Sequence, residues 1–236
     1  MIFLSDFGEA KLKKEEKQNL QGAIHESVPF AVLLALVGGF LDAYTFIGRG
    51  GVFANAQTGN VVLVGVYAAQ GEWIQALVHI PPILAFVLGV IVAELMKKYA
   101  ARRFISDWIK AVLMLEIIVL IIIGFIPQSV PNIVVTVIVS FVASVQVSSF
   151  RKLVDSPYST TMITGNLRTA AQAVYIACVK KDREAARRAM RFILIIFSFL
   201  AGALFSGLLM LMIGVKAIWG AAIILAAAVI LFRASS

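Results

Sequence analysis

Charged side chains are scarce in this 236-residue chain, in which Asp, Glu, Lys and Arg make up 14%, against about 25% in an average soluble domain. Hydrophobic residues make up 61%, and the mean hydropathy is +0.94. So few charges cannot cover so much apolar surface in water, which excludes a soluble globular enzyme, a disordered chain and a nucleic-acid-binding module. The net charge of +8 is therefore interpreted as a topology signal, because basic residues gather on the cytoplasmic side of membranes.

Cysteine and histidine are almost missing as well. Cys178 is the single cysteine, which excludes an internal disulfide and a metal site built from several cysteines. The two histidines, His25 and His79, have no metal-ligand pattern around them, and no Gly-x-Ser-x-Gly or His-x-Glu motif occurs. We therefore expect no catalytic residues, no metal and no cofactor. The first 26 residues are too polar for a secretory signal peptide, so the first apolar segment is expected to remain as a span.

Long apolar runs dominate the rest of the chain. An α-helix needs about 20 mainly apolar residues to cross a bilayer, and six runs reach or approach that length: 28–47, 76–96, 109–126, 131–150, 191–213 and 217–233. Two further runs, 58–70 and 164–179, are too short and are expected to be re-entrant or half-helices. The prediction is an all-α integral membrane protein with six transmembrane helices and two short ones. A cytoplasmic segment, 1–27, precedes a single transmembrane domain, 28–236.

The basic residues predict the orientation. If the two short runs enter and leave on one side, 18 of the 21 Lys and Arg residues lie on the side of the N-terminus. Arg49 and Lys216 then lie on the opposite side. If the short runs crossed fully, five positive charges between 97 and 110 would move to that opposite side, against the positive-inside rule. We therefore expect six spans with both termini in the cytoplasm.

The triplet Thr-Gly-Asn occurs twice, at 58–60 and 164–166. Each copy follows a span and opens a short apolar run that contains Val-Tyr. This pattern predicts two repeats, about 28–126 and 131–233. In the orientation above, the first span of one repeat runs outward and that of the other runs inward, so the repeats are inverted. Inverted repeats with interrupted helices are typical of secondary transporters with a site near the membrane midplane. The span after each short run carries small residues that allow close helix contact and that predict a homodimer: Gly89, Ala93, Gly202 and Ser206.

The same residues carry a family resemblance. The segments Gly39–Tyr44 and Phe53–Asn60 resemble the signature of the YoaK-type bacterial membrane proteins, also known as domain of unknown function 1275. Gln146 to Arg151 and Thr160–Asn166 resemble that family's second motif, although Val147 and Ser148 stand where the family has Asn and Ala. The resemblance covers about residues 30–230 and implies a multi-pass protein of the bacterial plasma membrane, without an established activity.

The candidate site combines the two triplets with polar residues of the adjoining spans. Thr58 and Thr164 are suited to cap a short helix through the side-chain oxygen. Two helix N-termini that meet inside a membrane would attract an anion or a carbonyl group. The alternative is structural, with Asn60 and Asn166 satisfying loop backbone groups. The predicted site residues are Asp42, Thr58, Gly59, Asn60, Gln146, Thr164, Gly165, Asn166 and Arg168.

Four charged residues of the apolar runs allow more than one interpretation. Arg168 either adds to an anion site, pairs with Asp42, or extends to the cytoplasmic face. Asp42 either relays protons or cations, or pairs with Arg168 or with free N–H groups of a short helix. Glu116 either titrates while buried or reaches Lys110 or another span, and Glu94 is expected to pair with Lys97 or Lys98.

The basic run 180–191 is interpreted as a cytoplasmic helix that touches anionic lipid. The leading functional hypothesis is a small secondary transporter or channel for a small, anionic solute. The alternative is a membrane adaptor or assembly factor that does not transport. The expected partners are the lipid bilayer, the small solute and a second copy of the chain, without nucleic acid.

Overall fold

The structure is a computed structural model that describes residues 27–103, 108–150, 152–153, 156–157 and 161–234. Most of the predicted N-terminal segment 1–27 and its lysines lie outside the described residues. The described chain is almost entirely helical, as predicted, with one antiparallel pair of two-residue strands, β1 (Lys152–Leu153) and β2 (Ser156–Pro157). The fold class, an all-helical protein, therefore matches the prediction from composition and apolar runs.

The helices follow the predicted apolar runs closely. The two short runs form α3 (Gln57–Ala69) and α8 (Ile163–Lys180), and the short helix α4 precedes α5. Two of the longer helices extend beyond their predicted runs, since α5 ends at residue 103 and α9 begins at residue 183. The bounds of the others are α2 (Val28–Gly48), α4 (Trp73–Val78), α5 (Ile80–Arg103), α6 (Trp108–Ile123), α7 (Asn132–Ser149), α9 (Arg183–Ile213), the 3₁₀ turn η1 (Gly214–Ala217) and α10 (Ile218–Ala234).

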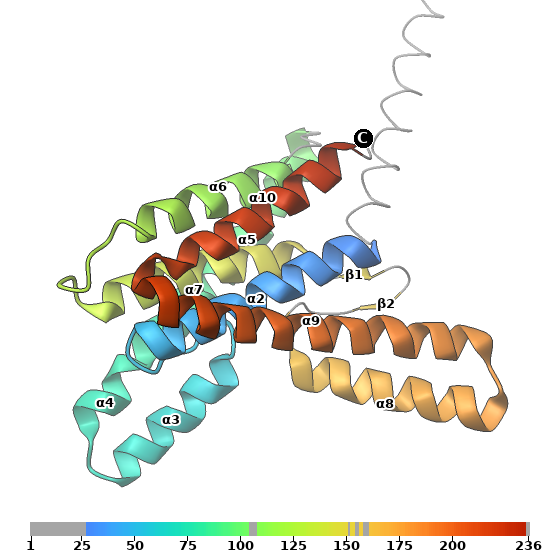
Figure 1. Cartoon of the computed structure of the whole chain (residues 1–236), viewed down its shortest axis with the longest axis horizontal. Coiled ribbons are helices and arrows are strands. Elements are labelled where there is room, and N and C mark those ends of the chain that lie inside the picture. Colours follow the sequence, from blue (N-terminus) through green and yellow to red (C-terminus); the bar gives the residue numbers. More distant parts are fainter. Residues whose placement is uncertain (1–26, 104–107, 151, 154–155, 158–160, 235–236) are drawn as a thin grey trace, which may run out of the picture.

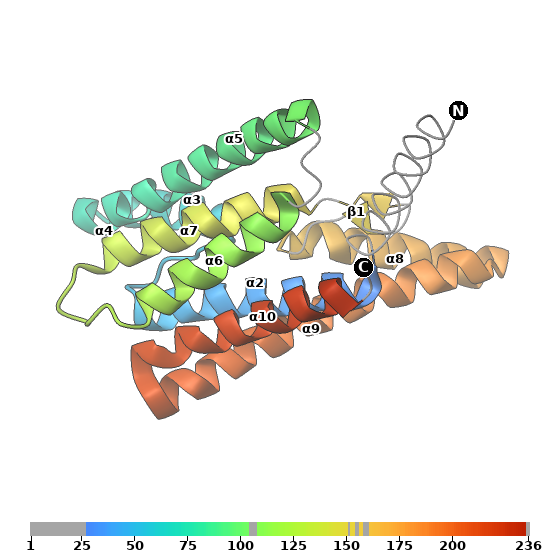
Figure 2. The same cartoon turned by 90° about the horizontal axis from the view of Figure 1, so that it is seen from above.

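Four helical segments of the described chain are long and apolar enough to cross a bilayer: Val28–Gly48, Trp73–Ala100, Asn132–Ser149 and Arg183–Leu231. The last of these contains the turn η1, at which the chain reverses between α9 and α10 (Figures 1 and 2). The described part of α6 has 16 residues, which is shorter than the length of about 20 that a full crossing takes. The protein is thus a membrane protein with several spans.

The helices of the first half pack mainly on those of the second half. Helix α2 lies along α9, α5 lies along α7, and α6 packs on α10. Figures 1 and 2 show that α2 and α7 run in opposite directions, as do α6 and α10. The main hydrophobic core joins α2, α6, α7 and α10, with residues such as Phe40, Leu120 and Leu225 fully buried. Neither half therefore holds a complete core of its own.

Glycine residues allow close approach in the two most extensive helix–helix contacts, α2 with α9 and α5 with α7. A Cβ atom on Gly202 of α9 would lie 1.9 Å from the Leu36 carbonyl oxygen of α2, and one on Gly39 would lie 1.9 Å from the Phe199 carbonyl oxygen. A Cβ atom on Gly89 of α5 would lie 1.8 Å from Ser144 Oγ of α7. Helices approach this closely only where a side chain is missing.

The small residues that suggested a homodimer are therefore used inside one chain. Gly89, Ala93, Gly202 and Ser206 are all buried within the single protomer, so they leave no small-residue face for a second copy. The homodimer stays a prediction without this support.

Basic residues lie at the two ends of the helix bundle. The C-terminal end of α5 with Lys97 and Lys98, and the start of α6 with Lys110, lie near the C-terminus of the chain (Figure 2). Arg49 follows the other end of α2, and Lys216 lies in the turn η1 at that same opposite end. This distribution agrees with the one on which the predicted orientation rests.

Candidate functional site

The centre of the site is Gly38, the eleventh of the 21 residues of α2. Asn55, which lies two residues before α3, donates a hydrogen bond from Nδ2 to the Gly38 carbonyl oxygen at 3.3 Å. Thr161 lies two residues before α8, and a Cβ atom on Gly38 would be 2.6 Å from its Cγ2 atom. The loops that lead into the two short helices therefore converge on the middle of α2, where the helix has no side chain to keep them away.

Asp42 holds the first of these loops one helical turn further along α2. Its Oδ1 atom accepts hydrogen bonds from the backbone N–H groups of Asn55 at 2.6 Å and of Ala56 at 3.3 Å. The carboxyl group is buried, and its Oδ2 atom has no hydrogen-bond partner. Of the alternatives left open for Asp42, the structure shows a partnership with N–H groups, those of the loop directly before α3.

Asn60 gives the same loop its shape. Its Oδ1 atom accepts from the Phe53 N–H group at 2.9 Å, and its Nδ2 atom donates to the Phe53 carbonyl oxygen at 2.8 Å. Nδ2 also donates to Gln57 Oε1 at 2.8 Å. Asn60 is fully buried, so the structural interpretation, in which this amide satisfies loop backbone groups, is confirmed for the first triplet. Asn166, its counterpart, is also buried.

The prediction that threonine side chains cap the short helices is wrong. The N-cap residues are Ala56 for α3 and Met162 for α8, and neither contributes a side-chain hydrogen bond. Thr58 and Thr164 lie one position inside their helices, and both are exposed. Asp42 does not take the capping role at the first helix either, because its partners are the N–H groups of Asn55 and Ala56, which precede α3.

The two glycines of the triplets differ. A Cβ atom on Gly59 would lie 2.8 Å from the Phe53 ring, which agrees with the expected close approach. Among the described residues nothing lies within 4 Å of the corresponding position on Gly165, which is exposed, so the prediction fails there.

Arg168 and Gln146 do not join the contacts around Asp42. Arg168 is exposed on α8, and no ion pair between it and Asp42 occurs in the described part of the chain. Gln146 is buried near the end of α7, and its Nε2 atom has no hydrogen-bond partner. The structure thus brings Asp42, Gly59 and Asn60 together and places Arg168 at the surface.

Two residues that the sequence did not single out for the site take part in it. Asn55 joins Asp42 and Gly38 as described above, and its Oδ1 atom is buried without a partner. His79 is buried, with Nδ1 at 3.3 Å from Asn60 Oδ1, and its ring stacks on Tyr67. The segment Phe53–Asn60 already carried the family resemblance, but nothing in the local sequence of His79 indicates this contact.

Two further carboxylates were considered from the sequence. Glu94 pairs with Lys97 at 3.1 Å, as expected. Glu116 is buried in α6, and neither of its carboxylate oxygens has a hydrogen-bond partner, so of the alternatives considered a hydrogen bond to Lys110 is not formed. The described residues contain no group of three or more His, Cys, Asp and Glu side chains that is placed to hold a metal ion.

Arg49 follows the C-terminal end of α2 and joins three parts of the chain there, at the end of the bundle that contains η1. It is fully buried, and its Nη2 atom donates to the Ile126 carbonyl oxygen at 3.3 Å. Its Nε atom donates to the Tyr44 hydroxyl group at 3.2 Å, and that hydroxyl group donates to the Val215 carbonyl oxygen at 3.0 Å. These bonds connect the end of α2 with the loop after α6 and with η1.

These features define a multi-pass α-helical membrane protein in which the loops before α3 and α8 meet at the middle of the first long helix. The family model for a protein of unknown function, DUF1275, matches residues 30–231, and the chain belongs to this family. The chain is 26% identical over 145 residues to the UPF0700 transmembrane protein YoaK of Bacillus subtilis (strain 168). That match covers 60% of this chain and 64% of the Bacillus protein. No solved structure matches this fold.

Proposed function

We propose that this protein is a small secondary transporter or channel of the bacterial plasma membrane, with its solute site where α3 and α8 begin. The observation that carries the proposal is the convergence of Asn55 and Thr161 on Gly38. Two chain segments interrupted at the same depth are the arrangement that places a site at the midplane in many transporters. The protein acts by binding and release, without a catalytic step.

The proposed architecture is two inverted repeats with six spans and both termini in the cytoplasm. It is supported by the reciprocal packing, because α2 on α9 corresponds to α7 on α5, with a glycine at each close approach. It is also supported by the short helices, since α3 and α8 lead away from the centre toward different ends of the molecule (Figure 1).

The atoms that remain available at the convergence favour a particular kind of solute. Asp42 Oδ2 and Asn55 Oδ1 are buried hydrogen-bond acceptors without partners, and such atoms are costly inside a membrane. The side chain of the N-cap residue Met162 binds none of the first-turn N–H groups of α8. We propose a small polar solute with a negative or carbonyl group for α8 and hydrogen-bond donors for Asp42 and Asn55.

The alternative, a membrane adaptor without transport, is favoured by the tight packing of this centre. The backbones of α2 and α9 are in direct contact at Gly39 and Gly202, and Asp42 and Asn60 are buried. In the described part of the chain, one pocket lies between α8 and α9 and another at the turn before α4, both away from this centre. A transporter in an occluded state would be packed in the same way, so a transport assay distinguishes the transporter from the adaptor.

The test combines binding with flux. The purified protein is screened by thermal shift against amino acids, organic acids, nucleobases and inorganic ions, and each stabilising solute is then followed across proteoliposome membranes. We expect a solute that stabilises the wild type and crosses the membrane, with both effects reduced at least about tenfold in Asp42→Asn. The exposed Glu72 provides the matched control, Glu72→Gln, which should behave as wild type. A screen without stabilisation or flux would favour the adaptor.

A further inference from the structure

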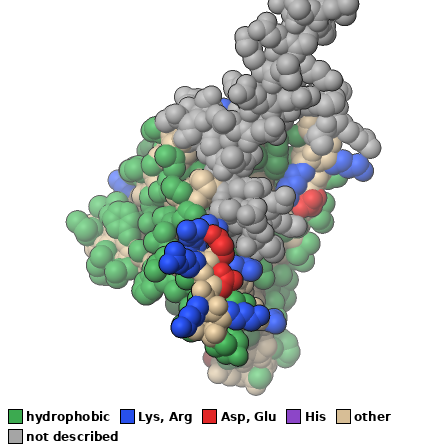
Figure 3. Space-filling view, turned by 90° about the vertical axis from the view of Figure 1, so that its right-hand side faces the viewer, with side chains coloured by type: hydrophobic (Ala, Val, Ile, Leu, Met, Phe, Trp, Pro, Cys, Tyr) green, Lys and Arg blue, Asp and Glu red, His purple; other side chains and the backbone are tan. Residues whose placement is uncertain are grey.

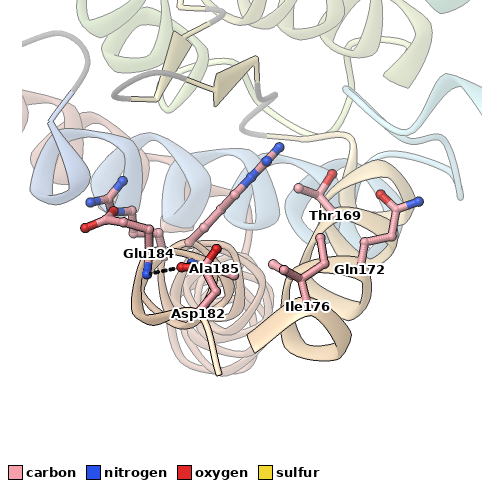
Figure 4. A pocket seen from close by; sticks show the side chains of 9 residues that line it. Thr169, Gln172, Ile176, Asp182, Glu184 and Ala185 are labelled. Atoms are coloured by element: carbon pink, nitrogen blue, oxygen red, sulfur yellow. Dashed lines mark hydrogen bonds between the residues drawn. The ribbon is translucent and has the colours of Figure 1, made fainter. Parts of the chain in front are cut away.

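A pocket lies between α8 and the start of α9, away from the convergence at Gly38. Its volume is about 330 Å³. The residues that matter for its chemistry are Thr169, Gln172 and Ile176 of α8, and Asp182, Arg188 and Arg191 of α9. Figure 4 shows that Thr169 and Gln172 project from α8, while Asp182 and Glu184 lie at the N-terminal turn of α9.

The acidic residues of this pocket already have partners. Asp182 Oδ1 accepts from the backbone N–H groups of Glu184 at 2.8 Å and Ala185 at 3.3 Å, which caps α9. Glu184 forms an ion pair with Arg187. Within the described part of the chain neither Arg188 nor Arg191 has an ion-pair partner. Because these two arginines are three residues apart on one helix, both can reach the same ligand.

The surroundings of the pocket are both strongly basic and apolar. Residues 168–191 carry seven Lys or Arg and two Asp or Glu side chains, a net charge of +5, and Figure 3 shows basic side chains gathered over this end of the molecule. On the same hairpin Tyr175, Val179 and Met190 are each more than 60% exposed. Exposed apolar side chains beside arginines match the level at which lipid headgroups meet acyl chains.

We propose that this pocket binds the phosphate group of an anionic phospholipid. The guanidinium groups of Arg188 and Arg191 bind the phosphate oxygens, because Arg presents paired N–H donors that match their geometry. Gln172 offers a further N–H donor from α8, whereas the Thr169 hydroxyl group already donates to the Gly165 carbonyl oxygen at 3.0 Å. The acyl chains lie along the exposed apolar residues of the hairpin. A lipid bound in this way holds α8 against α9 at the side of the membrane to which the sequence assigns the cytoplasm.

The experiment uses the full chain in a neutral detergent. Dioleoylphosphatidylglycerol, dioleoylphosphatidylcholine, glycerol 3-phosphate and inorganic phosphate are titrated separately, and binding is followed by native mass spectrometry and thermal shift. Three variants are compared with the wild type. Arg188→Gln/Arg191→Gln removes the two pocket charges. Arg188→Lys/Arg191→Lys keeps the charges and removes the paired donors. Lys180→Gln/Arg183→Gln removes two charges from the same hairpin outside the pocket lining.

We expect one tightly bound phosphatidylglycerol in the wild type and in Lys180→Gln/Arg183→Gln. Its affinity should fall at least about tenfold in Arg188→Gln/Arg191→Gln and by less in the lysine variant. Equal losses in the two glutamine variants, with unchanged Tm in the absence of lipid, would overturn the pocket in favour of a general charge effect. Equal stabilisation by inorganic phosphate or glycerol 3-phosphate would assign the pocket to a soluble phosphate and overturn the lipid.

Discussion

Asn60 and Thr58 belong to the same triplet and have opposite roles. Asn60 is buried and bonds both backbone groups of Phe53, whereas Thr58 is exposed. A sequence pattern shows that a triplet recurs, but it does not show which of its members faces inward. The two residues can therefore be separated by substitution.

We expect Asn60→Ala to lower the stability by about 1–3 kcal/mol, because it removes three hydrogen bonds and leaves both backbone groups of Phe53 without these partners. Thr58→Ala should change it by less than about 0.5 kcal/mol. Thermal unfolding of the purified proteins in detergent measures both. A larger loss in Thr58→Ala would restore the capping role that the structure does not give to Thr58.

Gly202 gives a second prediction at the scale of one residue. Gly202→Ala would place a methyl group against the Leu36 carbonyl oxygen, and the resulting shift of two helices should cost about 1–3 kcal/mol. Gly207 lies in the same helix, where an added Cβ atom would meet Ile47 at an ordinary 3.7 Å.

Gly207→Ala is therefore the matched control. It should be neutral or stabilising by about 0.5–1 kcal/mol, because alanine loses less backbone entropy in a helix. The Tm of the two variants should move in opposite directions, or only that of Gly202→Ala should fall. Equal Tm values would mean that α2 and α9 do not approach as closely as described.

Among the helices, the pairing of α2 with α9 and of α5 with α7 makes each half of the chain dependent on the other. The loop 127–129 between α6 and α7 is exposed, so the chain can be divided there without loss of a packed element. A half expressed alone would leave the faces of its helices without the partners that bury them.

We expect residues 1–128 and 129–236, expressed separately in cells, to be degraded or to aggregate. Co-expressed, they should form a 1:1 complex that is recovered through an affinity tag on either half. Gly39→Leu in the first half should weaken the complex, since its side chain would collide with Phe199 of the other half. Stable halves that do not associate would contradict the packing.

For the whole molecule, the distribution of charge predicts an orientation in the membrane. With both termini in the cytoplasm, the α8–α9 turn faces inside and residues 71–75 face outside. Cysteine labelling tests this in a Cys178→Ser background, because Cys178 is exposed in the wild type. A cysteine at Gln75 should react with an impermeant reagent in intact cells, and a cysteine at Arg183 should react only after permeabilisation. Labelling of the second variant in intact cells would reverse the orientation.

The homodimer remains a prediction at this scale. Since Gly89, Ala93, Gly202 and Ser206 are consumed within one chain, a dimer would have to form through larger side chains at the lipid-facing surface. Native mass spectrometry in mild detergent decides between the two states. A monomer at all protein concentrations would remove the homodimer.

The apolar runs by themselves determined where the helices lie, because the length and hydropathy of a membrane helix are local properties. The two triplets likewise indicated where α3 and α8 begin, and N–H groups were among the partners considered for Asp42. These features depend on residues near one another in the chain or on the general cost of unsatisfied groups in lipid.

The tertiary structure alone decided which polar groups meet. Thr161 reaches Gly38 from 123 residues away, and Tyr44 bonds Val215 across 171 residues. His79, the residue after α4, approaches Asn60 because α4 folds back along α3. The threonine caps failed because the helices begin at Gln57 and Ile163, which leaves Thr58 and Thr164 inside the first turns. Such contacts depend on how whole helices pack, which local sequence does not encode.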